Sequence, residues 1–284
     1  MQPSSGHIEI INTPPPLGLV KHALVDFDGT ISLIREGWEG IMAPVMFEAI
    51  CGGDPPPEIR EAVYRYIDES TGIETILQME RLVEMVREFG FVPEDRILDA
   101  QGYKAIYVAR IRAHVRDTVE ALERGHADPE EHRVPGALQL LEALRARGIE
   151  LYVVSGTDDE DVKREARAVG IFDVAGGRVY GSQRTFAEFS KGKFIKRLFE
   201  EQRLSGPELL VVGDGPVEIR LARERGAITI GVASSPKRDG AVSPARRERL
   251  IRAGAHAIVP DFAHWPSLME WLFPHHPIGS GRED

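Results

Sequence analysis

The stretch "ALVDFDGTIS", residues 23–32, places two aspartates one residue apart directly after an apolar run. The run Ala23–Val25 is too short for a helix and is typical of a strand that is buried on both faces. Asp26 and Asp28 follow it, and two like charges at the end of a buried strand cost electrostatic energy unless a positive charge compensates them. The stretch therefore indicates either a solvated turn, because Asp and Gly are common turn residues, or a site that binds a cation.

The composition narrows the classes of function. A chain of 284 residues can form one large domain or two smaller ones. The formal net charge of −10 argues against a protein that works on nucleic-acid phosphates or on anionic membranes. A chain this acidic needs local cations in any site that takes an anionic substrate.

The cysteine content and the apolar runs favour a cytoplasmic protein. Cys51 is the only cysteine, which excludes an intrachain disulfide and a cysteine metal cluster. The first residues lack the basic and apolar regions of a signal peptide. No apolar run is long enough to span a membrane, so no membrane association is expected.

The second half of the chain alternates short apolar runs with amphipathic segments. Capping Ser or Asp, Pro in the first turn and Gly after the last turn recur at the ends of these segments. The alternation is typical of an α/β fold whose parallel sheet has helices on both faces. The predicted strands lie at residues 149–156, 208–215, 227–234 and 255–260.

A long block directly after the first strand breaks this alternation, because it contains helical patterns and almost no strand signal. Such a block could simply enlarge the fold, but its position beside the two aspartates favours a lid over a site. Residues 7–12 have the pattern of a short edge strand. The expected division is an extension at 1–19, a core at 20–32 and 131–273, a helical cap at 33–130 and a polar tail at 274–284.

Polar residues with complementary chemistry follow the predicted strands. The carboxyl ends of parallel strands meet at one edge of a sheet, so we expect these side chains to converge. Carboxylates suit Mg²⁺, a hydroxyl next to a glycine amide can donate to phosphate, and lysine is a compact cation for phosphate. The residues concerned are Asp26, Asp28, Ser155, Gly156, Lys191, Asp214 and Glu218.

In their order and placement these residues resemble the haloacid dehalogenase-like superfamily over residues 20 to about 272. Its four motifs correspond to residues 26–30, to Ser155–Gly156, to Lys191, and to residues 213–214 with Glu218. The inserted block resembles the helical cap of the family's first cap class. The resemblance implies a Rossmann-like core, a Mg²⁺ cofactor and a positive charge that compensates the two adjacent aspartates.

The resemblance also implies roles for individual residues. Asp26 would be the nucleophile, and Asp28 would be the general acid for the leaving group and then the base for water. Asp26, Asp214 and the backbone carbonyl of Asp28 would ligate the metal, and Glu218 would bind or orient a metal water. Ser155 and Lys191 would complete the catalytic set.

Asp28 distinguishes among the reactions of the superfamily. Its dehalogenases lack an acid at this place and its transporting ATPases carry threonine, whereas a phosphatase or mutase must protonate an alkoxide. We favour hydrolysis of a phosphate monoester, with a phosphomutase as the alternative. A catalytically silent binding or scaffolding protein on the same fold is a third reading.

Several assignments stay open at this stage. Lys193 is an alternative to Lys191, and Thr30 either binds substrate or bonds locally in the turn. Trp38 either lines the substrate pocket or packs in the core of the first cap helix. Thr71 lies in "DESTGIET", residues 68–75, which is either a plain connection or a loop that reaches the phosphate.

The expected partner is a small phosphorylated metabolite enclosed between core and cap. A sugar or polyol phosphate is favoured, and a nucleotide is the alternative. Gly156, Thr30, Trp38 and Thr71 are the predicted substrate-binding residues. Gln78 lies on an amphipathic helix, where a solvated position is the default interpretation.

Overall fold

The computed structural model describes residues 7–182, 190–237 and 239–274. A seven-stranded sheet in the order β1-β7-β6-β5-β2-β3-β4 forms its centre. Six strands are parallel, and β1 pairs with β7 in the antiparallel sense. The strands are β1 (Glu9–Ile10), β2 (His22–Val25), β3 (Glu150–Asp158), β4 (Val179–Ser182), β5 (Leu209–Gly213), β6 (Ile228–Val232) and β7 (Ala257–Val259). The predicted α/β fold is confirmed.

Helices cover both faces of the sheet, because its strands carry apolar side chains on both sides. In β2, Ala23 and Val25 belong to one apolar cluster and Leu24 to the other, as the alternation of a strand requires. One face carries α7 (Lys191–Glu201), α8 (Pro216–Arg223) and α9 (Pro244–Arg252), and the other carries α5 (Ala137–Ala146), α6 (Asp159–Ala168) and α10 (Trp265–Leu272).

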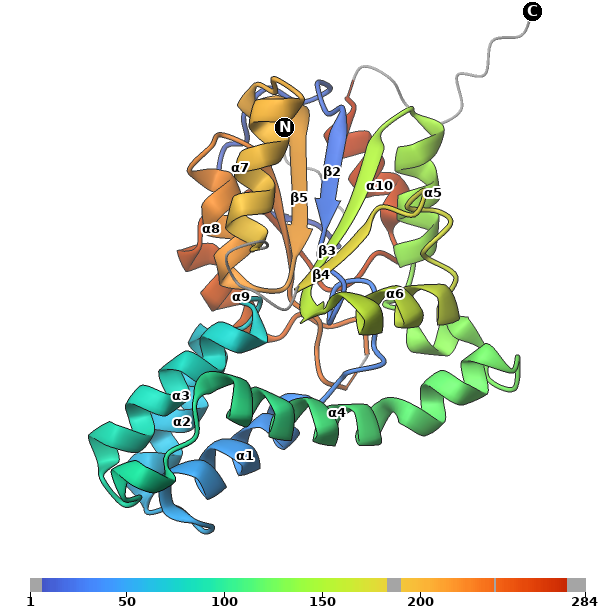
Figure 1. Ribbon diagram of the computed structural model, residues 1–284. Helices are drawn as coiled ribbons and strands as arrows, with labels where there is room; N and C mark the ends of the chain where they lie inside the picture. Colours follow the sequence, from blue (N-terminus) through green and yellow to red (C-terminus); the bar gives the residue numbers. More distant parts are fainter. Residues whose placement is uncertain (1–6, 183–189, 238, 275–284) are drawn as a thin grey trace, which may run out of the picture.

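The block between β2 and α5 is helical, as predicted. It contains α1 (Glu39–Cys51), α2 (Pro57–Glu69), α3 (Thr75–Phe89) and α4 (Ala100–Glu123), with short 3₁₀ helices at Glu94–Arg96 and Pro129–His132. A third 3₁₀ helix, Gly206–Glu208, precedes β5. The strand arrows in Figure 1 point towards these cap helices, so the carboxyl edge of the sheet faces the cap.

The cap is held together by apolar side chains of its own. Met46 of α1, Ile59 of α2, Leu82 of α3 and Ile111 of α4 are fully buried in one cluster. The same cluster continues into the face of the sheet that α5 covers. Cap and core are therefore packed against each other rather than joined by a linker alone.

Local signals placed several elements correctly. The Ser190 side chain caps α7 by accepting a hydrogen bond from the Lys193 N–H at 3.1 Å. The Ser243 side chain caps α9 in the same way. The predicted edge strand is β1, although it is only two residues long. The exact limits of cap, extension and tail stay predictions, and most of the tail lies outside the described residues.

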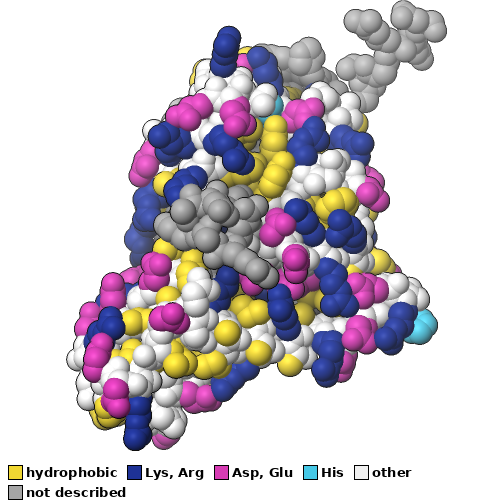
Figure 2. All heavy atoms as spheres, viewed as in Figure 1, with side chains coloured by type: hydrophobic (Ala, Val, Ile, Leu, Met, Phe, Trp, Pro, Cys, Tyr) yellow, Lys and Arg dark blue, Asp and Glu magenta, His cyan; other side chains and the backbone are white. Residues whose placement is uncertain are grey.

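The visible surface is mixed in charge. On the face shown in Figure 2, cationic and anionic side chains are interspersed, with small apolar areas between them. Within the three described ranges, no helix combines the length and apolar character needed to cross a bilayer.

Candidate active site

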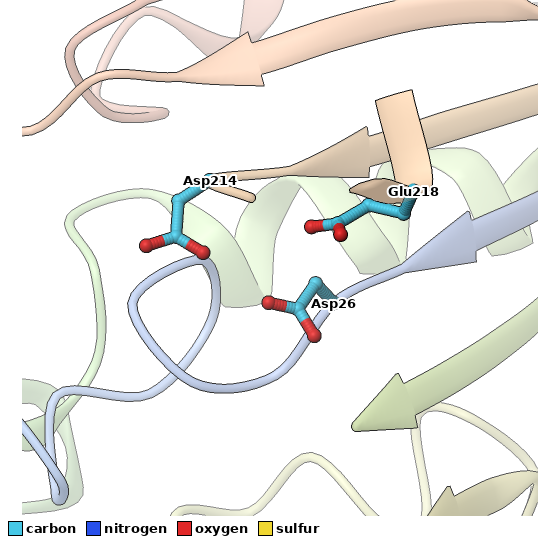
Figure 3. Close-up of side chains that lie close together, drawn as sticks. All are labelled: Asp26, Asp214 and Glu218. Atoms are coloured by element: carbon cyan, nitrogen blue, oxygen red, sulfur yellow. The ribbon is translucent and has the colours of Figure 1, made fainter. Parts of the chain in front are cut away.

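Three carboxylates converge at the carboxyl edge of the sheet (Figure 3). Asp26 directly follows β2, Asp214 directly follows β5, and Glu218 lies in the first turn of α8. One oxygen of each lies within 4.8 Å of the others, and all three residues are buried. The structure thus brings together the acids that the sequence predicts as metal ligands.

Lys191 supplies a positive charge to this cluster. It is the first residue of α7 and only 2% exposed, and its Nζ lies 2.7 Å from Asp26 Oδ1 and 3.6 Å from Glu218 Oε2. Lys193 is exposed on the same helix. Of the two candidate lysines, Lys191 is the one that reaches the predicted nucleophile.

The cations nearby do not fully balance the three buried carboxylates, although Arg246 Nη1 also lies 3.9 Å from Asp214 Oδ2. Burial raises the pKa of Asp26 well above its usual value, and Lys191 only partly opposes this rise. Burial likewise raises the pKa of Asp214 and of Glu218. Burial would lower the pKa of Lys191, but the carboxylates, led by Asp26, raise it overall. The cluster therefore favours additional positive charge.

The donor atoms of the cluster suit a hard divalent cation. They are all carboxylate oxygens, which Mg²⁺ prefers over nitrogen or sulfur. Glu218 Oε2 is buried and has no hydrogen-bond partner in the described part of the chain. Asp26, Asp214 and Glu218 can therefore hold a metal ion.

Asp28 is held by two hydroxyl groups. Its Oδ2 accepts hydrogen bonds from Ser155 Oγ at 2.8 Å and from Thr157 Oγ1 at 2.9 Å. Because side chains alternate along a strand, Ser155 and Thr157 of β3 point to the same side. Sequence reasoning stopped at Ser155 and missed Thr157, although the two-residue period could have found it.

The loop between α2 and α3 enters the site. Gly156 follows Ser155, and a Cβ atom there would lie 2.6 Å from the Ile73 carbonyl oxygen. Gly72 has φ +90°, and its Cβ position lies 2.5 Å from Glu218 Oε2. Only glycine allows these close approaches. Residues 68–75 therefore form a loop that reaches the carboxylate cluster, and its contact with phosphate stays a prediction.

Two further contacts fasten this loop to the core. Glu74 Oε1 accepts a hydrogen bond from the backbone N–H of Lys191 at 2.7 Å. Arg249 of α9 donates to Asp68 Oδ1 at 2.5 Å and to Thr71 Oγ1 at 3.2 Å. Neither Glu74 nor Arg249 was predicted, because each acts through a contact with a distant part of the chain.

A small pocket of about 70 Å³ lies between the carboxylates and the cap. Trp38, Thr71 and Gly156 line it, and Trp38 also packs against the apolar cluster of the core. That the three residues bind substrate stays a prediction. Thr30 does not line it: the residue is fully buried and its Oγ1 has no partner in the described ranges. The solvated position expected for Gln78 is wrong, because Gln78 is 5% exposed and faces the pocket. A helical pattern alone could not show that a second domain covers that face.

Comparison with known proteins identifies the family. The sequence model of the haloacid dehalogenase-like hydrolases matches residues 20–226, which is more than half of the chain. The chain belongs to this family. It is thus a hydrolase with a helical cap inserted after the first core strand, β2.

Individual relatives are distant. A phosphoglycolate phosphatase from Rhodospirillum rubrum is 29% identical to this hydrolase over 145 residues, which are 49% of this chain and 53% of the relative. The match thus spans about half the length of that relative.

The fold is shared with solved structures. A beta-phosphoglucomutase from Clostridium difficile has a TM-score of 0.57 at 11% identity, covering 90% of this chain and 97% of that one. A predicted phosphoglycolate phosphatase from Haemophilus somnus has a TM-score of 0.58 at 16% identity, covering 88% and 98%. At such low sequence identities the similarity shows the fold but does not identify the substrate.

Proposed function

We propose that this hydrolase is a Mg²⁺-dependent phosphatase that hydrolyses a small phosphate monoester through an aspartyl-phosphate on Asp26. The observation that carries the proposal is that the carboxylates of Asp26 and Asp28 line the same pocket. Asp26 lies 2.7 Å from the Lys191 ammonium group, and Asp28 is held by two hydroxyl groups. A nucleophile next to an acid–base group is what phosphate-ester hydrolysis needs.

The proposed reaction has two halves. First, Asp26 attacks phosphorus, the bond from phosphorus to the ester oxygen breaks, and Asp28 gives its proton to the departing alcohol. Then water gives a proton to Asp28 and attacks phosphorus, which frees Asp26 and yields inorganic phosphate. Lys191 balances the charge of Asp26 throughout. The backbone N–H of Gly156, which lines the pocket, is assigned to the phosphoryl oxygens, and the Ser155 hydroxyl, which donates to Asp28, is assigned to holding the acid–base group.

The proposed metal site consists of Asp26, Asp214, Glu218 and the backbone carbonyl of Asp28. When bound there, Mg²⁺ supplies positive charge to the phosphoryl oxygens. Without such a charge, the buried acids would repel a phosphate dianion. The all-oxygen donor set and the raised pKa values of the three acids support this assignment.

The pocket favours a sugar or polyol phosphate over a nucleotide. Pockets for drug-sized ligands usually measure about 300–1,000 Å³, whereas this one measures about 70 Å³. The name of the Rhodospirillum rubrum relative adds phosphoglycolate as an alternative that the volume of the pocket alone does not exclude. A small phosphorylated metabolite is the proposed partner in each case.

Release of phosphate from an aryl phosphate, with and without excess chelator, tests the reaction and the metal. We expect full dependence on Mg²⁺ and nearly complete loss of turnover in Asp26→Asn. The exposed ion pair of Asp54 with Arg60 offers a matched control, Asp54→Asn, which should stay active. Undiminished activity in excess chelator would refute the assignment of the metal site.

Isotope labelling separates hydrolysis from mutase chemistry. Water attacks phosphorus in the proposed reaction, so released phosphate should acquire one oxygen atom from labelled solvent. A mutase would return the phosphoryl group to another position of the same carbon skeleton. Isomerisation of a sugar phosphate with little phosphate release would overturn the phosphatase proposal.

A further inference from the structure

The charged side chains that line the pocket next to Asp28 bear on which substrate leaving groups can bind there. Among the described residues that line the pocket, the cationic ones are Lys191 and Arg35. Lys191 is paired with Asp26 and Glu218. Arg35 is therefore the group in this lining that could bind a carboxylate or a second phosphate of a substrate.

The Arg35 guanidinium is already occupied from the core side. Its Nε lies 3.0 Å from Glu165 Oε2, and its Nη2 lies 2.7 Å from Glu165 Oε1. Asp161 Oδ2 lies 3.6 Å from Nη2, and Asp28 Oδ1 lies 3.9 Å from Nε. Three carboxylates thus surround this one cation.

The Arg35–Glu165 pair is buried and has two-point geometry. The side chains of Arg35 and Glu165 are 8% and 4% exposed, and their contact is bidentate. A bidentate guanidinium–carboxylate pair fixes both partners in one geometry. Removing Arg35 from Glu165 would leave a buried carboxylate unpaired, which is strongly unfavourable. A substrate anion cannot easily displace Glu165.

The other cap side chains that line the pocket carry no charge. Thr75, Gln78 and Tyr107 line it and can exchange hydrogen bonds with hydroxyl groups, and Trp38 adds an apolar ring. An anion placed among them would face Asp28 without a free cation in this lining. A hydroxyl group carries no such cost.

We propose that the leaving group of the substrate is a short, hydroxyl-bearing fragment without negative charge, and that Glu165 determines this specificity by holding Arg35. The inference rests on the proposed phosphatase function and refines its substrate class. It gives the wild-type enzyme a preference against carboxylate-bearing esters such as phosphoglycolate.

Three esters of nearly equal size test the proposal, because they differ chiefly in the charge of the leaving group. These are 2-hydroxyethyl phosphate, 2-phosphoglycolate and 2-aminoethyl phosphate. We expect kcat/KM of the wild type to be at least tenfold higher for the hydroxyethyl ester than for phosphoglycolate. The aminoethyl ester should also exceed phosphoglycolate, since the surrounding carboxylates repel only anions.

Glu165→Gln tests the residue. The amide keeps the size of Glu165 but loses its charge, so Arg35 becomes available to a substrate carboxylate. The ratio of kcat/KM for phosphoglycolate to that for the hydroxyethyl ester should rise at least fivefold. Glu123→Gln, which removes the same charge from the exposed pair with the neighbouring Arg164, should leave that ratio unchanged.

The outcomes separate this inference from the proposed function. Activity on aryl and hydroxyethyl esters with equal or better use of phosphoglycolate would overturn the inference and leave the phosphatase intact. Equal rejection of both charged esters, or an unchanged ratio in Glu165→Gln, would overturn the role of Glu165. No hydrolysis of any ester would instead remove the proposed function. If Glu165→Gln does not fold, Glu165→Asp provides a weaker pair and should shift the ratio in the same direction.

Discussion

Replacement of Lys191 by Met should destabilise the metal-free protein by about 3–5 kcal/mol, the usual cost of removing one partner of a buried ion pair. Lys191 is 2% exposed and lies 2.7 Å from Asp26 Oδ1. Met has a similar shape and adapts to irregular spaces, so little packing energy should be lost. The loss of unfolding free energy therefore measures the cost of leaving the buried carboxylates without Lys191.

A double-mutant cycle isolates this interaction. Asp26→Asn removes one of the carboxylates that Lys191 compensates, so Lys191→Met should cost less in that background. The expected coupling is about 1–3 kcal/mol, as for residues in one charged network. Burial raises the pKa of these acids, so they become protonated, and lose their charge, as the pH falls. The loss of unfolding free energy caused by Lys191→Met should therefore be smaller at pH 5 than at pH 8.

Urea unfolding in the presence of chelator measures these free energies. Lys193→Met on the exposed side of the same helix is the matched control and should change stability by less than about 0.5 kcal/mol. A cost below about 1 kcal/mol for Lys191→Met, or simple additivity with Asp26→Asn, would refute the reasoning, since a buried pair must then be compensated elsewhere.

Three further perturbations test other parts of the molecule. Asp28→Asn should lower kcat by about 10²–10⁴-fold, with a larger loss for alkyl than for nitrophenyl esters; equal losses would argue against Asp28 as the acid. Arg249→Met should lower the melting temperature and raise KM, because Asp68 and Thr71 lose their hydrogen bonds to the core; unchanged values of both would show that Arg249 does not fasten the loop. Burial, aided by Arg223, lowers the pKa of His256 to about 4, so the unfolded chain binds a proton that the folded protein resists. The free energy of unfolding should therefore decrease as the pH is lowered from about 6.5 to 4, by at most about 1.4 kcal/mol per pH unit. Over this range, the urea midpoint of His256→Asn should decrease less steeply than that of the wild type.

The sequence was most informative where one local signal sufficed. Buried apolar runs such as residues 23–25 and 209–213 predict strands, and parallel topology then brings their polar ends together. Strand β4, "VYGS", was missed because half of it is glycine and serine and its conformation depends on pairing with β3. Helix α10 was also missed.

Within the site, the missing residues are those that act across the chain. Arg249 contacts the loop from a helix 178 positions from Thr71, and Glu74 caps α7 from 117 positions away. No spacing rule relates such residues to the motif aspartates. Arg35 lies close to the first motif in the sequence, but its partner Glu165 is 130 positions away and is recognised only in the folded structure.

The antiparallel pairing of β1 with β7 has a consequence for biogenesis. Glu9 pairs with Ile258, Asn12 donates to the Ala255 carbonyl and Arg247 pairs with Glu9, so the start of the chain completes the sheet against one of its last strands. During synthesis this edge cannot close until the residues of β7 have emerged from the ribosome. An open edge is a template for pairing with other chains. Nascent or C-terminally truncated molecules should therefore be the species most prone to aggregate, and the ones that most need chaperone protection.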